Sequence, residues 1–295
     1  MALALQGTFT ALVTPFRADG SLDLDALASL CEWQIASGVD GLVPCGSTGE
    51  AATLSHEEHV RVVRHVVEVA AKRVPVIAGA GSNSTREAVE LTAAARAAGA
   101  DAALLISPYY NKPTQEGIFQ HYRTVASETR LPIVIYNIPG RTASRIDPET
   151  SARLSRVTGV AGLKECGGDF IATSETILQA APSFSVLAGD DANTLPMLEI
   201  GARGVISTVA NVAPAPVAAL VRAHGAGDHA RARQLHYALL PLCQVLFLES
   251  NPIPVKTALA ILGRIPNAVM RLPLTEISKT NRDRLEAVLA ELPRA

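Results

Sequence analysis

The sequence has little of what marks secreted, membrane-spanning or nucleic-acid-binding proteins. Its cysteines are few and scattered, without a Cys-x-x-Cys pair or a secretory leader; they are Cys31, Cys45, Cys166 and Cys243. This pattern predicts reduced thiols and a cytoplasmic location rather than a disulfide framework. The formal net charge is only −2, so charge gives no reason to expect a nucleic acid or an anionic membrane as partner. No apolar run approaches the length of a membrane span.

Aromatic residues are few as well, at 4% of the chain, whereas alanine, valine and leucine are abundant. Continuous apolar runs, typical of parallel strands buried on both faces, alternate with stretches of helical periodicity. We expect strands at residues 9–16, 41–45, 74–79, 102–107, 131–137, 160–164, 185–189 and 204–208. Eight strand-helix units of this kind predict an α/β fold, the (β/α)8 or TIM barrel.

A doubly wound open sheet is the alternative fold. It is disfavoured because no Gly-x-Gly-x-x-Gly follows the first expected strand. Beyond the eighth strand, further helices are expected at residues 214–226, 229–248, 252–262 and 280–292. We therefore assign residues 1–225 to the barrel, which carries the active site, and residues 226–295 to a C-terminal helical appendage.

A lone lysine, Lys164, ends the sixth expected strand, just before a turn at Gly167 and Gly168. A buried lysine has a lowered pKa, because burial disfavours the charged ammonium. The neutral amine is a nucleophile toward carbonyl groups, which is what a Schiff-base lysine needs. The ordinary alternative is a lysine at a strand end that simply reaches water.

Polar side chains follow the other expected strands, and in a barrel such strand ends meet at one mouth. They are Ser47 and Thr48 after the second strand, Tyr109 and Tyr110 after the fourth, Tyr136 and Arg141 at and beyond the end of the fifth, and Asp190 and Asp191 after the seventh. Singly, each has a structural interpretation as a rim aromatic, a turn residue or a helix cap, and capping is the interpretation we favour for the two aspartates. Together with a lysine they suit imine chemistry, because tyrosine can move protons and small hydroxyls can hold a carboxylate or relay a proton.

A metal mechanism has weaker support. His56 and His59 lie three residues apart, which places them on one helix face, but no third ligand stands nearby in the sequence. We expect neither a metal nor a cofactor in the active site.

Six motifs resemble those of the dihydrodipicolinate synthases, a family of pyruvate-dependent class I aldolases related to N-acetylneuraminate lyase. They are Gly-Ser-Thr-Gly-Glu at residues 46–50, Ser-Pro-Tyr-Tyr-Asn-Lys-Pro at 107–113, Tyr-Asn-Ile-Pro-Gly-Arg-Thr at 136–142, Gly-Leu-Lys-Glu at 162–165, Gly-Asp-Asp at 189–191 and Asn-Pro-Ile-Pro-Val-Lys at 251–256. The first and fourth belong to the whole superfamily, whereas the second and third are typical of the synthases. The similarity extends from about residue 7 to about residue 284.

The resemblance implies condensation of pyruvate with L-aspartate 4-semialdehyde in lysine biosynthesis. It implies that Lys164 forms the Schiff base with pyruvate and that Tyr136 donates and accepts protons. Ser47 would link Tyr136 to Tyr110 in a proton relay. In this family the second tyrosine comes from a neighbouring subunit, which implies at least a dimer and usually a homotetramer built as a dimer of dimers.

The resemblance also implies residues that bind the two substrates. Thr48 and the backbone near Ile206 and Gly189 would hold the pyruvate carboxylate and the enamine. Arg141, at the mouth, would bind the carboxylate of the semialdehyde through the two parallel bonds that a guanidinium can form.

Inhibition by the end product, lysine, is a further expectation from the family. Its lysine-sensitive members bind the inhibitor in a cleft between two subunits, and the matching positions are Ala51, His56, His59, Asn83, Glu87 and Tyr109. A glutamate can neutralise the ammonium, and asparagine and tyrosine can hydrogen-bond the rest of the amino acid. The alternative is that these are ordinary surface positions near the start of a helix, with Ser55 as its cap.

Two positions depart from the family pattern. Ser47 stands where the synthases usually have threonine; serine keeps the hydroxyl but loses the methyl group that limits its rotamers, and it is common in the lyase branch. Cys166 follows the Lys-Glu pair where alanine is frequent. Because side chains alternate along a strand, Cys166 shares a face with Lys164, either as a reactive thiol or, more in keeping with its size, as a small filler.

Two other functions stay open at the level of sequence. A sugar-acid aldolase or lyase would use the same imine but a polyhydroxylated aldehyde, which needs hydroxyl-binding partners rather than the single carboxylate clamp that Arg141 suggests. A keto-acid-sensing protein without enzymatic activity would have no need of the full set Lys164, Tyr136 and Tyr110.

Overall fold

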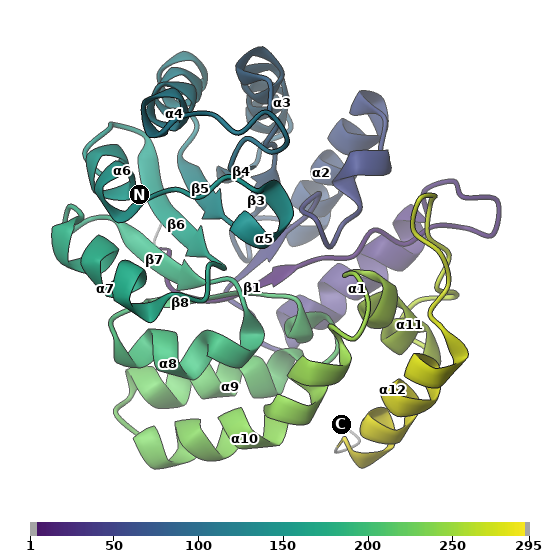
Figure 1. The fold of residues 1–295 in the computed structure, drawn as a ribbon. Coiled ribbons are helices and arrows are strands. Elements are labelled where there is room, and N and C mark those ends of the chain that lie inside the picture. Colours follow the sequence, from purple (N-terminus) through teal and green to yellow (C-terminus); the bar gives the residue numbers. More distant parts are fainter. Residues whose placement is uncertain (1–4, 293–295) are drawn as a thin grey trace.

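The barrel predicted from the sequence is confirmed in the computed structural model, which describes residues 5–292 (Figure 1). Its parallel strands are β1 (Gly7–Ala11), β2 (Gly41–Val43), β3 (Ile77–Gly79), β4 (Ala102–Ile106), β5 (Ile133–Asn137), β6 (Val160–Glu165), β7 (Ser185–Ala188) and β8 (Gly204–Ser207). They pair in the order β2-β1-β8-β7-β6-β5-β4-β3. A parallel bridge between Leu42 and Val76 then brings β2 to the start of β3 and closes the ring.

Several strands are shorter than expected, and proline accounts for the late start of the run at residues 74–79. The apolar run at residues 9–16 is a strand only as far as Ala11, and Pro15 lies in the irregular part that follows. The run at residues 74–79 contains Pro75 and becomes a strand only at Ile77. Proline has no N–H to donate, so it is excluded from the interior of a paired strand.

Helices cover the outside of the barrel and connect its strands (Figure 1). They are α1 (Leu24–Ala36), α2 (His56–Ala70), α3 (Thr85–Ala97), α4 (Gln115–Thr129), α5 (Pro139–Thr142), α6 (Pro148–Leu154), α7 (Phe170–Gln179), α8 (Thr194–Glu199) and α9 (Pro214–Gly225), with 3-10 turns η1 (Ala51–Thr53), η2 (Asp191–Asn193) and η3 (Val209–Asn211). Ser55 caps α2 in a reciprocal capping box with Glu58, which satisfies free backbone N–H groups at the helix start.

Apolar side chains form two layers. The larger one fills the space between strands and helices and includes Leu27, Val66 and Tyr122. The smaller one lies inside the barrel and includes Phe9 and Ile206. Because the interior is packed with side chains, the barrel has no open pore, and chemistry is confined to the mouth where the strands end.

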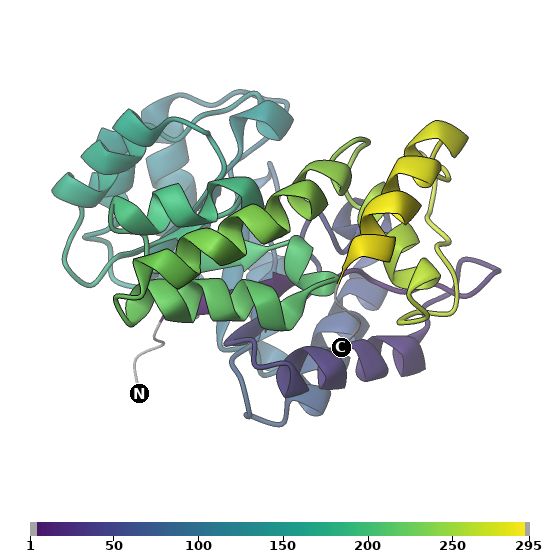
Figure 2. The ribbon, with the colours of Figure 1, turned by 90° about the horizontal axis from the view of Figure 1, so that it is seen from below.

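The C-terminal helices α10 (His229–Val245), α11 (Ile253–Ile261) and α12 (Lys279–Glu291) lie against one side of the barrel. Figures 1 and 2 both show α10 beside α9, with α11 and α12 next to them. Leu242, Val255 and Leu285 from these helices belong to the same apolar layer that packs the barrel helices. In the part of the chain that the structure describes, no helix combines the length and the apolar character needed to cross a bilayer.

Candidate active site

Lys164 lies near the end of β6, and only 5% of it is exposed. Its neighbour across the sheet is Tyr136 on β5, and the lysine Nζ lies 4.4 Å from the centre of the tyrosine ring. Burial lowers the pKa of Lys164 below its ordinary value, and the nearby Arg141 acts in the same direction, while Cys166 and Asp191 oppose it. The structure therefore has the buried lysine that the sequence predicted, with a larger fraction of neutral amine than an exposed lysine has.

Tyr136 is also buried, and burial raises the pKa of its hydroxyl well above the ordinary value. The hydroxyl therefore stays protonated at neutral pH and can donate a proton to a reacting oxygen. Ser47 acts in the opposite direction and lowers this pKa. Ser47 and Tyr136 line the same two spaces at the mouth of the barrel, and the proton relay between them stays a prediction.

Thr48 is held from two sides in the loop after β2. Its Oγ1 lies 3.3 Å from Oγ1 of Thr208, beyond β8, and accepts a hydrogen bond of 2.8 Å from Nδ2 of Asn251. Arg141, on α5, donates from Nη2 to the carbonyl oxygen of the same asparagine at 3.1 Å. Asn251 comes from the C-terminal region, so this region takes part in building the mouth of the barrel.

These side chains converge on a small cavity. Its volume is about 50 Å³, and its lining includes Ser47, Thr48, Tyr136, Arg141, Lys164, Gly189, Thr208 and Asn251. Ile206, expected nearby, is fully buried in the apolar layer inside the barrel. The lining offers an amine that can react with a carbonyl group and hydroxyl groups that can bind a carboxylate.

Position 189 must be glycine because its neighbours leave no space for a side chain, not because of its backbone conformation. A Cβ built there would overlap Sγ of Cys166 and come within 2.8 Å of Cε of Lys164. Cys166 and Lys164 therefore share a face, as strand alternation predicted. Burial raises the pKa of the Cys166 thiol to about 12, which keeps it protonated and supports the filler interpretation over a reactive thiol.

The two aspartates after β7 have different roles, only one of which matches the expectation. Asp190 caps η2 by accepting a hydrogen bond from the backbone N–H of Ala192 at 3.1 Å. Asp191 does not cap this turn. Its carboxylate accepts from the backbone N–H groups of Thr208 and Val209 at 2.9 and 3.2 Å, so it fixes the loop after β8 that carries Thr208.

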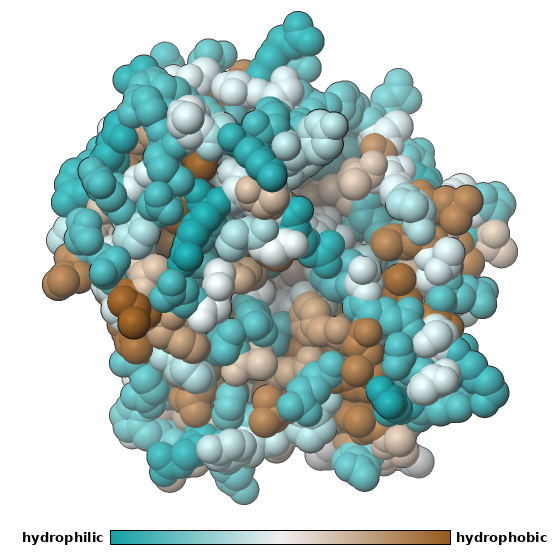
Figure 3. Space-filling model, viewed as in Figure 1, coloured by the Kyte–Doolittle hydropathy of each residue, from teal (hydrophilic) through white to brown (hydrophobic). Residues whose placement is uncertain are grey.

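A larger cleft of about 480 Å³ adjoins the cavity and reaches toward α2 and α3. Its lining includes Ser47, Tyr136 and Arg141 together with five of the six positions expected to bind lysine, namely Ala51, His56, His59, Glu87 and Tyr109. The sixth, Asn83, donates from Nδ2 to the carbonyl oxygen of Tyr109 at 3.2 Å. Figure 3 shows a hollow near the middle of this face of the molecule.

The two histidines of α2 do not face the cleft in the same way. His56 is exposed and pairs with Glu87, with 3.0 Å between Nε2 and Oε1. His59 is buried, and its Nε2 lies 2.7 Å from the carbonyl oxygen of Gly79. Burial lowers the pKa of His59, which favours its neutral form. The ring of His59 is therefore already engaged by the backbone of Gly79, and its role in binding lysine stays a prediction.

Tyr110 lies outside both cavities. It is 89% exposed and its backbone is left-handed, with φ of 70°. Within one chain it is not among the residues that line the space around Lys164. The resemblance predicted that this tyrosine serves a neighbouring subunit, and an exposed position is what such a role needs.

A buried ion pair that was not predicted supports the loop of residues 46–50. Nζ of Lys256, on α11, lies 2.6 Å from Oε1 of Glu50, and both side chains are 0% exposed. The same Nζ donates to the carbonyl oxygen of Val269 at 2.6 Å. Both residues occur in recognisable motifs, but they are 206 positions apart, and no local pattern pairs them.

Comparisons with known proteins agree with this geometry. The model of the dihydrodipicolinate synthetase family matches residues 4–292. The 4-hydroxy-tetrahydrodipicolinate synthase of Nitratidesulfovibrio vulgaris is 54% identical over 285 residues, covering 96% of this chain and 97% of the relative.

Two solved structures superpose closely on the chain. The chloride-inhibited dihydrodipicolinate synthase from Acinetobacter baumannii, complexed with pyruvate, is 44% identical with a TM-score of 0.95 and covers 97% of this chain and 98% of its own. The enzyme from Cyanidioschyzon merolae, with lysine bound, is 36% identical with a TM-score of 0.94 and covers 97% of both chains. The chain therefore belongs to the dihydrodipicolinate synthetase family, whose members are lyases of the class I aldolase type.

Proposed function

We propose that the chain is a 4-hydroxy-tetrahydrodipicolinate synthase that condenses pyruvate with L-aspartate 4-semialdehyde on Lys164. The observation that carries this proposal is the buried amine of Lys164, 4.4 Å from the ring of Tyr136 in a cavity lined by hydroxyl groups. The names of the relatives and the pyruvate complex of the Acinetobacter baumannii enzyme support the choice of substrates.

The reaction follows from imine chemistry. The neutral amine of Lys164 attacks the keto carbon of pyruvate, and loss of water leaves a protonated imine. Loss of a proton from the methyl group gives an enamine, whose carbon attacks the aldehyde of the semialdehyde and forms the new carbon–carbon bond. The amino group of the semialdehyde portion then attacks the imine carbon, which closes the ring and releases Lys164.

The surrounding residues supply proton transfer and binding. Tyr136 protonates the leaving oxygen in imine formation and removes protons in later steps, with Ser47 linking it to Tyr110 of a second copy. Thr48, with the backbone near Gly189 and Ile206, holds the pyruvate carboxylate and the enamine.

Arg141 is the proposed binding partner of the semialdehyde carboxylate. It is exposed at the mouth and lines both the small cavity and the larger cleft. Its contact with the carbonyl oxygen of Asn251 uses one nitrogen, Nη2, and the guanidinium has further N–H donors for a carboxylate.

The proposal is tested by trapping the imine. Borohydride reduction in the presence of pyruvate should add the reduced pyruvate group to one peptide, the one that contains Lys164. Lys256, also buried but ion-paired, is an internal control that should remain unmodified. An adduct on Lys256, or no adduct, would refute the mechanism. If Lys164 carries the adduct but the enzyme turns over only sugar-type aldehydes, the imine mechanism holds and aspartate semialdehyde is not the second substrate.

We also propose a cytoplasmic homotetramer, a dimer of dimers, that lysine inhibits. The free state of the cysteines agrees with a reducing location, and the exposed Tyr110 agrees with service to a second copy. The Cyanidioschyzon merolae enzyme, solved with lysine bound, supports lysine as a ligand, and the cleft beside Tyr109 is the site that we propose for it.

A titration with lysine tests the regulation. Turnover should fall more than pyruvate binding weakens, with a coupling free energy of about 1 to 3 kcal/mol. Glu87→Thr should abolish the effect, because it removes the carboxylate that faces the cleft. Glu90→Thr, on the same helix but outside the cleft lining, is the matched control and should respond like the parent. An unchanged rate at millimolar lysine would remove the regulatory claim and leave the catalytic one intact.

A further inference from the structure

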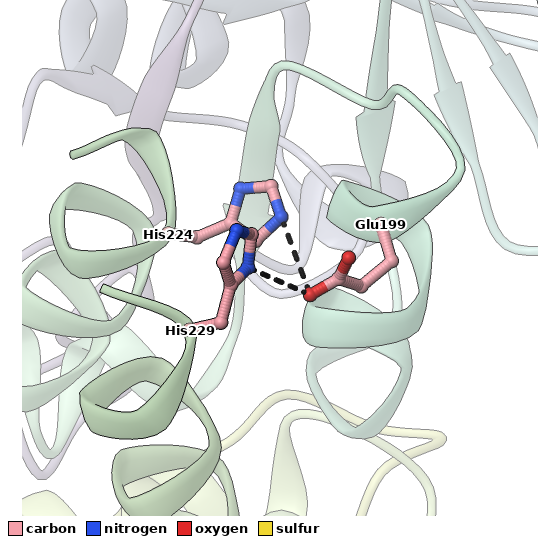
Figure 4. Close-up of side chains that lie close together, drawn as sticks. All are labelled: Glu199, His224 and His229. Carbon is pink, nitrogen blue, oxygen red and sulfur yellow. Dashed lines mark hydrogen bonds and ion pairs between the residues drawn. The ribbon is translucent and has the colours of Figure 1, made fainter. Parts of the chain in front are cut away.

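Three side chains far from Lys164 aim their polar atoms at one point on the outside of the barrel (Figure 4). They are Glu199, the last residue of α8, His224, in the last turn of α9, and His229, the first residue of α10. One ligand atom from each lies within 4.8 Å of the others. Among residues 5–292 this is the one group of three or more histidine, cysteine or acidic side chains that meets this criterion.

Hydrogen bonding alone leaves this cluster incomplete. Nδ1 of His229 lies 3.1 Å from Oε1 of Glu199, which is a hydrogen bond, but Nε2 of His224 lies 3.6 Å from the same oxygen. The second distance is too long for a hydrogen bond. Nε2 of His224 is buried and has no hydrogen-bond partner among the described residues, although such groups are normally satisfied.

We propose that Glu199, His224 and His229 bind a zinc ion that joins α8, α9 and α10. Zinc lies about 2.0 to 2.2 Å from imidazole nitrogen and carboxylate oxygen, so neighbouring ligand atoms of a tetrahedral site are about 3.3 Å apart. The distances of 3.1 and 3.6 Å to Oε1 of Glu199 bracket this value. A water molecule would complete the site from the solvent side, where the side chains of Glu199 and His229 are each about half exposed.

The donor set selects the class of ion. Two imidazoles and one carboxylate suit zinc and similar transition metals, whereas magnesium and calcium take oxygen ligands. Both histidines must offer an unprotonated nitrogen, and a zinc ion would give the buried Nε2 of His224 the partner that it lacks.

The position of the cluster indicates stabilisation rather than catalysis. α8 ends at Glu199, shortly before β8 begins at Gly204, so the cluster lies near the N-terminal ends of the strands, opposite the mouth that holds Lys164. In barrels of this kind that face contributes to stability and the other face carries chemistry. A zinc ion here would tie the C-terminal helix α10 to the barrel helices α8 and α9.

Equilibrium dialysis of the untagged, chelator-treated full chain against zinc tests the proposal. We expect one zinc per chain, and at least tenfold weaker binding in Glu199→Gln and His229→Asn. His236→Asn is the matched control, because His236 lines the depression beside the cluster together with Glu199 and His229 but is not one of the three ligands. Its affinity should equal that of the parent.

Two independent readouts accompany the dialysis. Zinc at one hundred times its Kd should raise the Tm by about 5 °C, magnesium should not, and turnover should be unchanged. Cobalt should give the visible absorption of a four-coordinate ion in the parent and in His236→Asn only. Absence of zinc binding, binding retained in Glu199→Gln or His229→Asn, or equal loss in the His236 control would each overturn the proposal.

Discussion

Replacing Lys256 by methionine should destabilise the protein more than any exposed charge substitution. Methionine keeps most of the length of the side chain but removes the ammonium, which contacts Oε1 of Glu50 and the carbonyl oxygen of Val269 at 2.6 Å each. The Glu50 carboxylate would then remain at 0% exposure without its cation. Breaking a buried ion pair in this way costs about 3 to 5 kcal/mol, because the carboxylate keeps the hydrogen bond from the backbone N–H of Arg271 but loses its ion-pair partner in the interior.

The free energy of unfolding in urea, followed by circular dichroism at one fixed protein concentration, measures this cost. Lys279→Met is the matched control, since Lys279 also contacts a carboxylate, that of Asp283, at 3.0 Å but is 89% exposed. We expect a change below about 0.5 kcal/mol there. Because Glu50 ends the loop that carries Ser47 and Thr48, Lys256→Met should also raise the KM for pyruvate, whereas the control should not.

A double-mutant cycle isolates the pair itself. Adding Glu50→Gln to Lys256→Met removes the unpaired charge, so the double variant should be more stable than the sum of the two single effects by about 1 kcal/mol or more. Additive effects, or a Lys256→Met variant within about 1 kcal/mol of the parent, would refute the reasoning. The ion pair would then contribute nothing beyond ordinary packing.

Four further predictions concern the proposed catalytic and binding groups and one partly buried ion pair. Arg141→Ala should raise the KM for aspartate semialdehyde about 10- to 100-fold, equivalent to about 1.5 to 3 kcal/mol, and leave that for pyruvate nearly unchanged; equal changes would make the residue structural. Tyr136→Phe should lower turnover by about 10²-fold in steady-state assays, and Ser47→Ala should do likewise while Ser47→Thr is tolerated; parent-like turnover in Ser47→Ala would exclude the relay. Because burial lowers the pKa of Lys164 from 10.5, imine formation should rise with pH to a midpoint below that value, and a midpoint at or above it would contradict the role of burial. Arg271 donates to the two carboxylate oxygens of Glu58 at 2.6 and 2.7 Å, which holds the pKa of this carboxyl at about 2, against 4.5 unperturbed. The stabilisation is therefore present above pH 4.5 and is lost as the pH falls toward 2. Glu58→Gln should cost about 1.5 kcal/mol at pH 7 and flatten the acid side of the unfolding curve, and an unchanged acid slope would argue against it.

The sequence was sufficient for the features that repeat or that depend on near neighbours. Continuous apolar runs indicated the parallel strands, and Ser55 marked the start of α2. Because every strand of a parallel barrel ends at the same mouth, strand order also placed Lys164, Tyr136 and Ser47 near one another. The motifs then supplied their roles, which remain predictions until the imine is trapped.

The structure decided which side chains meet across long sequence separations and which way they point. Glu50 and Lys256 pair across 206 positions, Asp191 binds the loop after β8 instead of capping its own turn, and His59 turns to Gly79 while His56 turns to Glu87. Periodicity reports only whether a position is buried, so it cannot choose among the partners that closing the barrel brings together. Glu199, His224 and His229 also come together from three helices only when the barrel closes. The sequence therefore determined the barrel and the position of its lysine. The tertiary structure determined the long-range contacts that support them.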